Sequence, residues 1–203
     1  MSGNRIAILG GSFDPVHLGH LFLLHCAVSM TDYTKFILIP AKLSNFKQGS
    51  SPLASDRCRL EMLSLALQDY REIYPQDREA DIVISDMEIS RGGVSYTSDT
   101  VRFFRESDPS AQIGLVMGDD HVGGLSRWHD FGYLRDNVEF LICRRSGDDG
   151  IWKDLPENIR YKKLEPSELA PQSSSAVRAD RDANLDYLSQ RVREYVRANN
   201  LYS

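Results

Sequence analysis

Two glycines and two histidines near the N-terminus form the pattern in this sequence that is best suited to chemistry. Gly10 and Gly11 follow the apolar run of residues 6–9, and His17 and His20 come just before a second apolar run. Glycine lacks a Cβ atom, so the backbone at such a turn can approach a ligand closely. A helix that starts after the turn presents unpaired N–H groups and the positive end of its dipole, which favour phosphate. The stretch therefore predicts a strand, a glycine turn and a helix around an anion, with both histidines on one helical face.

Other interpretations of this stretch are open at the level of sequence. Glycine-containing turns between strands and helices are often purely structural, and the histidines could be a capping residue and a surface residue. The spacing differs from the G-x-G-x-x-G of dinucleotide-binding domains and from the lysine-containing P-loop. A zinc site of Asp14, His17 and His20 is a further alternative, although the spacing is not the H-E-x-x-H of zinc proteases.

Apolar segments of strand length alternate with amphipathic helical segments along the chain. Periodicity predicts strands over residues 6–9, 35–40, 81–85, 112–117, 138–143 and 159–164. It predicts helices over residues 18–30 and 55–69, one that starts near 95–100, and a closing helix that carries Leu185, Leu188, Val192 and Val196. This alternation implies a parallel sheet with right-handed crossovers. We therefore expect an α/β fold, a doubly wound (Rossmann-like) parallel sheet with helices on both faces, in a single domain of residues 1–203.

Three further segments fall after predicted strands or at a helix start, where doubly wound sheets bind their ligands. The loop of residues 41–52 carries two lysines and is long for a plain connection, although it could be a solvated, irregular loop. The segment Gly118–Asp120 at the end of a predicted strand offers a carboxylate that could bind a sugar hydroxyl or cap a helix. The serines of residues 173–175, with Arg178 one turn later, could form a second phosphate cradle or an ordinary helix cap.

Composition excludes several classes of function. The chain has 203 residues and a formal net charge of −5, without a basic run, so we expect no nucleic-acid partner. It has no apolar stretch of about eighteen residues and no apolar signal-peptide core, so we expect no membrane partner. The cysteines Cys26, Cys58 and Cys143 form no C-x-x-C pair, which indicates reduced thiols and a cytoplasmic location. The sequence leaves open whether the chain forms a homo-oligomer.

Taken together, the motifs resemble those of bacterial nicotinate-nucleotide adenylyltransferases, a family of nucleotidyltransferases with the H-x-G-H motif. The most specific match is Gly-Gly-Ser-Phe-Asp-Pro-x-His-x-Gly-His at residues 10–20. Ser-Tyr-Thr-x-Asp-Thr at residues 95–100, Gly-x-Asp at 118–120 with Trp128, and Ser-Ser-Ser-x-Val-Arg at 173–178 follow in the order and spacing of that family.

The resemblance implies adenylyl transfer from ATP to nicotinate mononucleotide, which forms deamido-NAD and pyrophosphate in NAD biosynthesis. The implied catalytic residues are His17, His20, Lys47 and Arg178. ATP binding is implied for Gly10, Gly11, Ser12, Phe13, His17, His20, Gly118, Asp120, Ser174, Ser175 and Arg178. Substrate binding is implied for Lys47, Tyr96, Thr97 and Trp128. Mg²⁺ would bind through the ATP phosphates, without a metal site made by the protein.

The loop after residue 40 departs from the family pattern. Members commonly have Pro-x-x-x-Pro-Pro-His-Lys there, of which this chain keeps only Pro40 and Lys47. The alternatives are another nucleotidyltransferase, acting on nicotinamide mononucleotide or pantetheine phosphate, or a non-catalytic nucleotide-binding protein. The segment at residues 95–100 and Trp128 favour the nicotinate substrate, and His17 and His20 argue against a non-catalytic protein.

Overall fold

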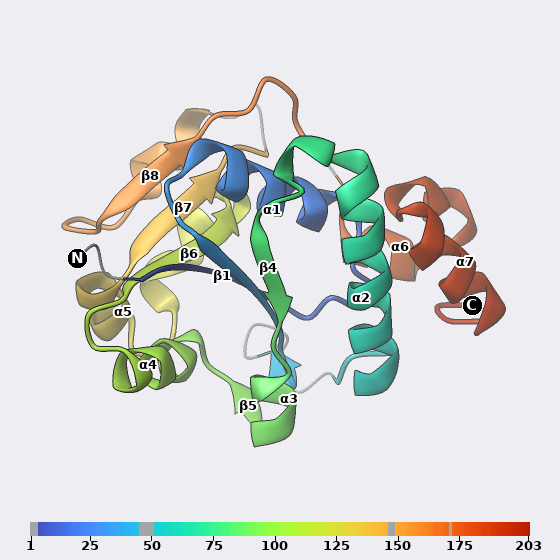
Figure 1. Ribbon diagram of the computed structural model, residues 1–203, viewed down its shortest axis with the longest axis horizontal. Helices are drawn as coiled ribbons and strands as arrows, with labels where there is room; N and C mark the ends of the chain where they lie inside the picture. The colour runs from blue at the N-terminus through green and yellow to red at the C-terminus, as the bar shows by residue number, and fades with distance from the viewer. Residues whose placement is uncertain (1–3, 45–50, 146–148, 171) are drawn as a thin grey trace.

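A six-stranded parallel sheet forms the centre of the computed structural model, which describes residues 4–44, 51–145, 149–170 and 172–203 (Figure 1). The strands lie in the order β4-β2-β1-β6-β7-β8, and each pairs with its neighbours in parallel. All six strands predicted from the sequence are present: β1 (Arg5–Gly11), β2 (Lys35–Pro40), β4 (Asp81–Ile84), β6 (Gln112–Gly118), β7 (Glu139–Cys143) and β8 (Tyr161–Leu164).

The sheet is covered on both faces, which confirms the doubly wound fold. Successive side chains of a strand point to opposite faces. In β1, Ala7 and Leu9 join one hydrophobic core, and Ile6 and Ile8 join the other. The first core is completed by three helices, α1 (Leu18–Met30), α2 (Asp56–Ile73) and α7 (Gln190–Ala198). The second is completed by α4 (Thr97–Ser107) and α5 (Phe131–Asn137).

The direction in which strands are added reverses next to β1. The chain runs from β1 outward through β2 to β4, then crosses to β6 and runs outward through β7 to β8. Connections that diverge in this way leave a crevice beyond the carboxyl ends of the two central strands. Gly11 ends β1 and Gly118 ends β6, so two of the predicted ligand-binding turns lie at this crevice.

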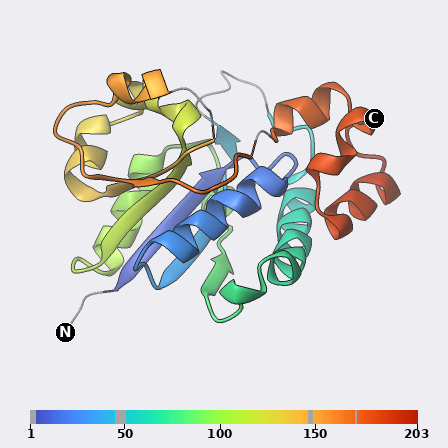
Figure 2. The ribbon, with the colours of Figure 1, turned by 90° about the horizontal axis from the view of Figure 1, so that it is seen from above.

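The C-terminal segment consists of α6 (Ser174–Ala179), the 3-10 helix η4 (Asp182–Tyr187) and α7, and Figure 2 shows it beside α2. Leu188 has an extended backbone, with φ −98° and ψ 144°, and separates η4 from α7. The single closing helix that we expected is therefore two helices. The four apolar side chains of its predicted face are nevertheless all buried. Arg191 fastens α7 to α2, because its Nη1 donates to the buried carboxylate of Asp69 at 2.5 Å.

Several short elements were not predicted. The strands β3 (Leu43–Ser44) and β5 (Val94–Ser95) pair in parallel and tie the loop after β2 to the start of α4. Two-residue strands carry no periodic signal, and the short helices α3 (Met87–Arg91), η1 (Pro75–Asp77), η2 (Asp119–Arg127) and η3 (Asp149–Asp154) carry little. The helix expected to end at Asp69 continues to Ile73. In the part of the chain described here, no helix has the length and apolar character needed to cross a membrane.

Candidate active site

The two histidines of the motif lie against each other at the start of α1. His17 is the buried N-cap residue, and its backbone N–H donates to Nδ1 of His20 at 3.2 Å. The centroids of the two imidazole rings are 3.8 Å apart. A Cβ atom at Gly19 would lie 2.9 Å from Nδ1 of His17 and 3.0 Å from the carbonyl oxygen of Gln172. The glycine between the histidines therefore lets the His17 ring and the segment before α6 pack closely on the first turn of the helix.

Burial lowers the pKa of His17 well below its usual range, and the neighbouring His20, Arg145 and Arg178 lower it further. Burial disfavours the charged imidazolium, and positive neighbours do the same. His17 is thus neutral at pH 7. A neutral imidazole offers one N–H donor and one acceptor nitrogen.

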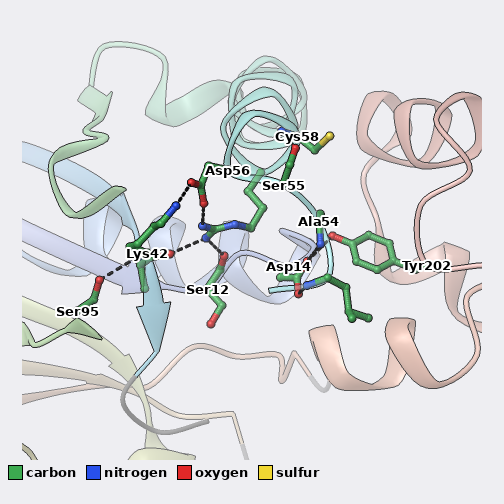
Figure 3. Close-up of polar contacts among 12 residues, drawn as sticks. Ser12, Asp14, Lys42, Ala54, Ser55, Asp56, Cys58, Ser95 and Tyr202 are labelled. Carbon is green, nitrogen blue, oxygen red and sulfur yellow. Dashed lines mark hydrogen bonds and ion pairs between the residues drawn. The ribbon is translucent and has the colours of Figure 1, made fainter. Parts of the chain in front are cut away.

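Asp14, inside the same motif, is a structural anchor. Its buried carboxylate accepts hydrogen bonds from the backbone N–H groups of Leu53, at 2.8 Å, and Ala54, at 3.0 Å. The phenol of Tyr202 donates to the same carboxylate at 2.8 Å, as Figure 3 shows. The carboxylate is therefore occupied by structural contacts, and in the described ranges no three His, Cys, Asp or Glu side chains group as metal ligands would. This argues against the zinc site considered from the sequence.

The serine segment docks on the histidine motif, so the two predicted phosphate cradles adjoin. Ser173 caps α6, since its Oγ accepts from the N–H of Ala176 at 3.2 Å. Ser174 donates from its Oγ to the carbonyl oxygen of Pro15 at 3.0 Å. Arg178 donates from Nη1 to the carbonyl oxygen of Asp14 at 2.6 Å and from Nη2 to Oγ of Ser175 at 3.1 Å.

A pocket of about 200 Å³ opens where these segments meet. Its volume is below the roughly 300–1,000 Å³ of sites that enclose a small molecule, so it suits one group of a ligand, such as a phosphate. Arg178 supplies a cation at its wall. The lining residues come from the glycine turn, from both ends of the loop after β2 and from α6: Ser12, Asp14, Ser44, Ser51, Pro52, Leu53 and Arg178.

The end of β6 is held by Arg145, which the sequence did not single out as a site residue. Its Nη1 lies 3.4 Å from the carboxylate of Asp120, and its Nη2 donates to the carbonyl oxygen of Gln172 at 2.6 Å. A Cβ atom at Gly118 would overlap Oδ1 of Asp120 and lie 2.7 Å from Cδ of Arg145, so a larger residue there would displace both side chains. Asp120 is about half exposed, with 52% of its side chain accessible, so its carboxylate can also reach a ligand in the crevice.

The residues expected to bind the second substrate gather at the start of α4. Tyr96 is the N-cap residue, and its ring stacks on His129 with centroids 4.0 Å apart. The buried hydroxyl of Ser98 lies 3.1 Å from Nδ1 of His129. Trp128 is half-buried against the second core, with its ring edge-on to that of His121. Thr97 is the first residue of α4 and therefore lies at the same helix start, next to Tyr96.

The structure thus forms two groups from the predicted residues. His17, His20, Ser12, Ser174, Ser175 and Arg178 come together around the β1–α1 turn, and Tyr96, Thr97 and Trp128 lie near the start of α4. The β3–β5 pairing connects the groups through Ser44, which lines the pocket, and Ser95. Lys47 lies outside the described residues.

The fold and the glycine–histidine turn define a member of the cytidylyltransferase-like family, whose family model matches residues 8–180. Within this class, the chain belongs to the nicotinate-nucleotide adenylyltransferases. A protein of Methylacidiphilum infernorum described as a probable nicotinate-nucleotide adenylyltransferase is 31% identical, over 98% of this chain and 92% of its own. The resemblance inferred from the motifs is therefore confirmed.

Two solved structures share the fold. They show the nicotinic acid mononucleotide adenylyltransferase of Plasmodium falciparum complexed with APC and with NaAD. The first superimposes with a TM-score of 0.79 and the second with 0.77, each at 21% identity and over 98% of this chain and 97% of the other. At this identity the likeness shows the fold alone.

Proposed function

We propose that this chain transfers the adenylyl group of ATP to nicotinate mononucleotide, forming deamido-NAD and releasing pyrophosphate in NAD biosynthesis. The observation that carries the proposal is that the rings of His17 and His20 lie against each other at the start of α1. The helix α6 docks beside them, and Arg178 of that helix donates to the carbonyl oxygen of Asp14. The family to which the chain belongs supports the choice of substrates.

The reaction needs no nucleophile from the protein. A phosphate oxygen of nicotinate mononucleotide attacks the α-phosphorus of ATP, and the bond from that phosphorus to the oxygen bridging to the β-phosphate breaks, so pyrophosphate leaves. Catalysis then consists of positioning the two phosphates and stabilising charge as it shifts to the leaving group. We assign these roles to His17, His20 and Arg178, and to Lys47 by the family motif.

The neutral state of His17 suits this role. A neutral imidazole donates its N–H to a phosphate oxygen without the desolvation cost of a buried cation. Arg178 provides the permanent charge, with a planar fork of donors that matches phosphate oxygens. Both groups are already held in place by the protein, because the His17 ring is buried against the ring of His20 and Arg178 donates to the carbonyl oxygen of Asp14. Preorganised donors of this kind need little rearrangement when the charge moves.

We assign the remainder of the ATP site to the two strand ends and α6, and the nicotinate site to the start of α4. The ATP residues are Gly10, Gly11, Ser12, Phe13, Gly118, Asp120, Ser174 and Ser175, and Tyr96, Thr97 and Trp128 bind the second substrate. Asp120 has an accessible carboxylate, which can accept from a ribose hydroxyl. Trp128 is half-buried, so one part of its ring is held by the core and the rest can contact a pyridine ring.

Mg²⁺ is proposed to enter with ATP. The described polar side chains around the pocket are serines, an arginine and the anchored Asp14, which fit a cation carried by phosphates and water better than one held by the protein. When bound, Mg²⁺ neutralises charge on the phosphate oxygens. We also propose a cytoplasmic location, in keeping with the three free cysteines, and no nucleic-acid or membrane partner.

A pyrophosphate-release assay tests the proposal. The purified chain is incubated with ATP, Mg²⁺ and, in separate reactions, nicotinate mononucleotide, nicotinamide mononucleotide or pantetheine phosphate. We expect pyrophosphate and deamido-NAD with the nicotinate substrate, and a loss on the order of a hundredfold in kcat for His20→Ala. Pyrophosphate only with another acceptor would reassign the substrate, and none with any acceptor would indicate a protein that binds nucleotides without catalysis.

A further inference from the structure

Arg59 of α2 is a charged residue buried completely inside the protein, and its contacts single it out. Its Nη1 donates to the carbonyl oxygens of Ser12 and Ala41, each at 2.7 Å, and its Nη2 donates to Asp56 at 2.7 Å. A buried charge is costly, and apolar side chains of similar volume often serve stability as well or better. The guanidinium therefore needs an explanation beyond filling the core.

Both carbonyl groups belong to residues that directly follow parallel strands of the sheet. Ser12 follows β1 and lines the pocket beside Arg178. Ala41 follows β2, and its N–H donates to the carbonyl oxygen of Gly11 at 2.8 Å. A single side chain from α2 thus holds the chain where it leaves two neighbouring strands, and one of these two points, Ser12, comes shortly before the His17–His20 motif.

The hydrogen bond from Arg59 to the carbonyl oxygen of Ser12 fixes the orientation of the Ser12–Phe13 peptide group. In a trans peptide the carbonyl and the following N–H point in opposite directions. With the Ser12 carbonyl held toward α2, the N–H of Phe13 is directed away from that helix. Phe13 itself has φ 46°, a left-handed conformation that a bulky residue adopts only when its surroundings impose it. Arg59 restrains one side of this residue, and the anchored Asp14 restrains the other.

The Arg59 guanidinium is also linked, through Asp56, to the start of α4, where we propose that the second substrate binds. The carboxylate of Asp56 is shared between Arg59 and Nζ of Lys42, whose backbone N–H donates to Oγ of Ser95 at 2.9 Å. Ser95 immediately precedes Tyr96, the N-cap of α4. Burial acts to raise the pKa of the Asp56 carboxyl, but the hydrogen bonds and charges of Lys42 and Arg59 outweigh it, and the net shift is downward. The linking carboxylate therefore stays charged.

We propose that Arg59 is a positioning residue for the adenylyl-transfer reaction. It holds the Ser12–Phe13 peptide in the geometry that receives the nucleotide phosphates, and through Asp56 and Lys42 it sets that turn relative to the start of α4. The inference rests on the proposed function for its kinetic consequences, but the structural role can be measured without substrate.

The test compares Arg59→Lys with Arg105→Lys. The lysine keeps the charge of Arg59 but not the planar fork that joins two carbonyl groups and a carboxylate. Arg105 is a matched control, since it binds the carbonyl oxygens of Pro109, Ala111 and Asn137, away from the crevice. We expect Arg59→Lys to lower kcat about tenfold to a hundredfold, as small displacements of reacting groups do. Arg105→Lys should lower Tm by about as much as Arg59→Lys does. It should nevertheless leave kcat and both KM values within about twofold of those of the unmodified chain.

Amide hydrogen exchange of residues 10–16 in the free protein supplies the second readout. Arg59→Lys should speed exchange there, and Arg105→Lys should not. If Arg59→Lys does not fold, Asp56→Asn gives the same test, because it removes the charge that holds Arg59 and Lys42 while keeping the shape of the side chain. The proposal would be overturned if the folded Arg59→Lys or Asp56→Asn variant kept both the exchange rates of residues 10–16 and the kcat of the unmodified chain. It would also be overturned if Arg105→Lys lost as much kcat as Arg59→Lys. If the unmodified chain releases no pyrophosphate, the proposed function fails, and the exchange result alone decides the role of Arg59.

Discussion

The phenol of Tyr202 donates to the carboxylate of Asp14 at 2.8 Å, which joins the segment after α7 to the turn after β1. The two residues are 188 positions apart in the sequence. Burial raises the pKa of Tyr202, and the charge of Asp14 and the hydrogen bond to it raise it further, so the phenol keeps its proton and remains a donor. Tyr202 has φ 59°, in the left-handed region, and the contact offsets the cost of that conformation. The C-terminal segment therefore helps to shape the turn between β1 and α1.

Tyr202→Phe should destabilise the protein. A hydrogen bond to a charged, buried acceptor contributes about 1.5–3 kcal/mol, and Asp14 would keep only its two backbone donors. We expect the free energy of unfolding to fall by roughly that amount in urea titrations, with a raised KM for ATP. Tyr161→Phe on the edge strand β8 is the control, because that tyrosine is exposed. Equal stability of the Tyr202 and Tyr161 variants would show that the phenol contributes nothing to the turn.

His17 should make the protein less stable in mild acid. Its pKa is lowered from 6.5 in the folded state, so between that lowered value and about 6.5 the unfolded chain binds a proton that the folded chain does not. Stability therefore falls as the pH falls through this window, by at most about 1.4 kcal/mol for each pH unit from this residue. Urea midpoints between pH 7.5 and 5 measure the slope. His17→Asn should reduce it, whereas the exposed control His121→Asn should retain it. The same slope in all three proteins would mean that His17 is not buried in its neutral form.

The positions that sequence alone could predict are those that depend on neighbouring residues. The β1–α1 turn is recognisable because Gly10 and Gly11 lie between two apolar runs, and Ser173 is recognisable as a cap because of the serines that follow it. Positions that depend on distant contacts were not predictable. Arg59 lies three and four residues before the buried Met62 and Leu63, so its helical spacing matches the buried face of α2. An arginine is not expected in such a position, and only the tertiary structure shows the partners at the ends of β1 and β2 that hold it there.

The same reasoning explains the differences around the loop after β2. Strands β3 and β5 are stabilised by each other across fifty residues of sequence, so neither has a local signal. The break at Leu188 lies in an apolar pattern that would also suit one continuous helix, and the packing against α2 selects two. The role of Arg145 has no local signal either, because its partners Asp120 and Gln172 come from two separate segments.

Discrimination between nicotinate mononucleotide and its amide is the sharpest prediction for the start of α4. The N-cap Tyr96 gives the first turn no side-chain hydrogen bond, so the positive end of this helix is suited to a carboxylate. A carboxylate accepts at both oxygens, whereas an amide would turn its NH₂ group toward a donor and leave both unpaired. Such a buried mismatch costs about 1–3 kcal/mol, so we expect a preference for the acid of roughly tenfold to a hundredfold in kcat/KM.

Trp128 should contribute affinity without contributing to this preference. Its ring can stack on the pyridinium of either substrate, a contact worth about 1–2 kcal/mol. Trp128→Ala should therefore lower kcat/KM for acid and amide alike, by roughly fivefold to thirtyfold, and leave their ratio nearly unchanged. The measurement is kcat/KM for both mononucleotides in the unmodified chain and in Trp128→Ala. Trp152→Ala is the control, because the Trp152 ring contacts Lys163 of the edge strand β8. If the unmodified chain used acid and amide equally well, the helix start would not be the carboxylate site. If Trp128→Ala changed the ratio strongly, the preference would lie in the tryptophan instead.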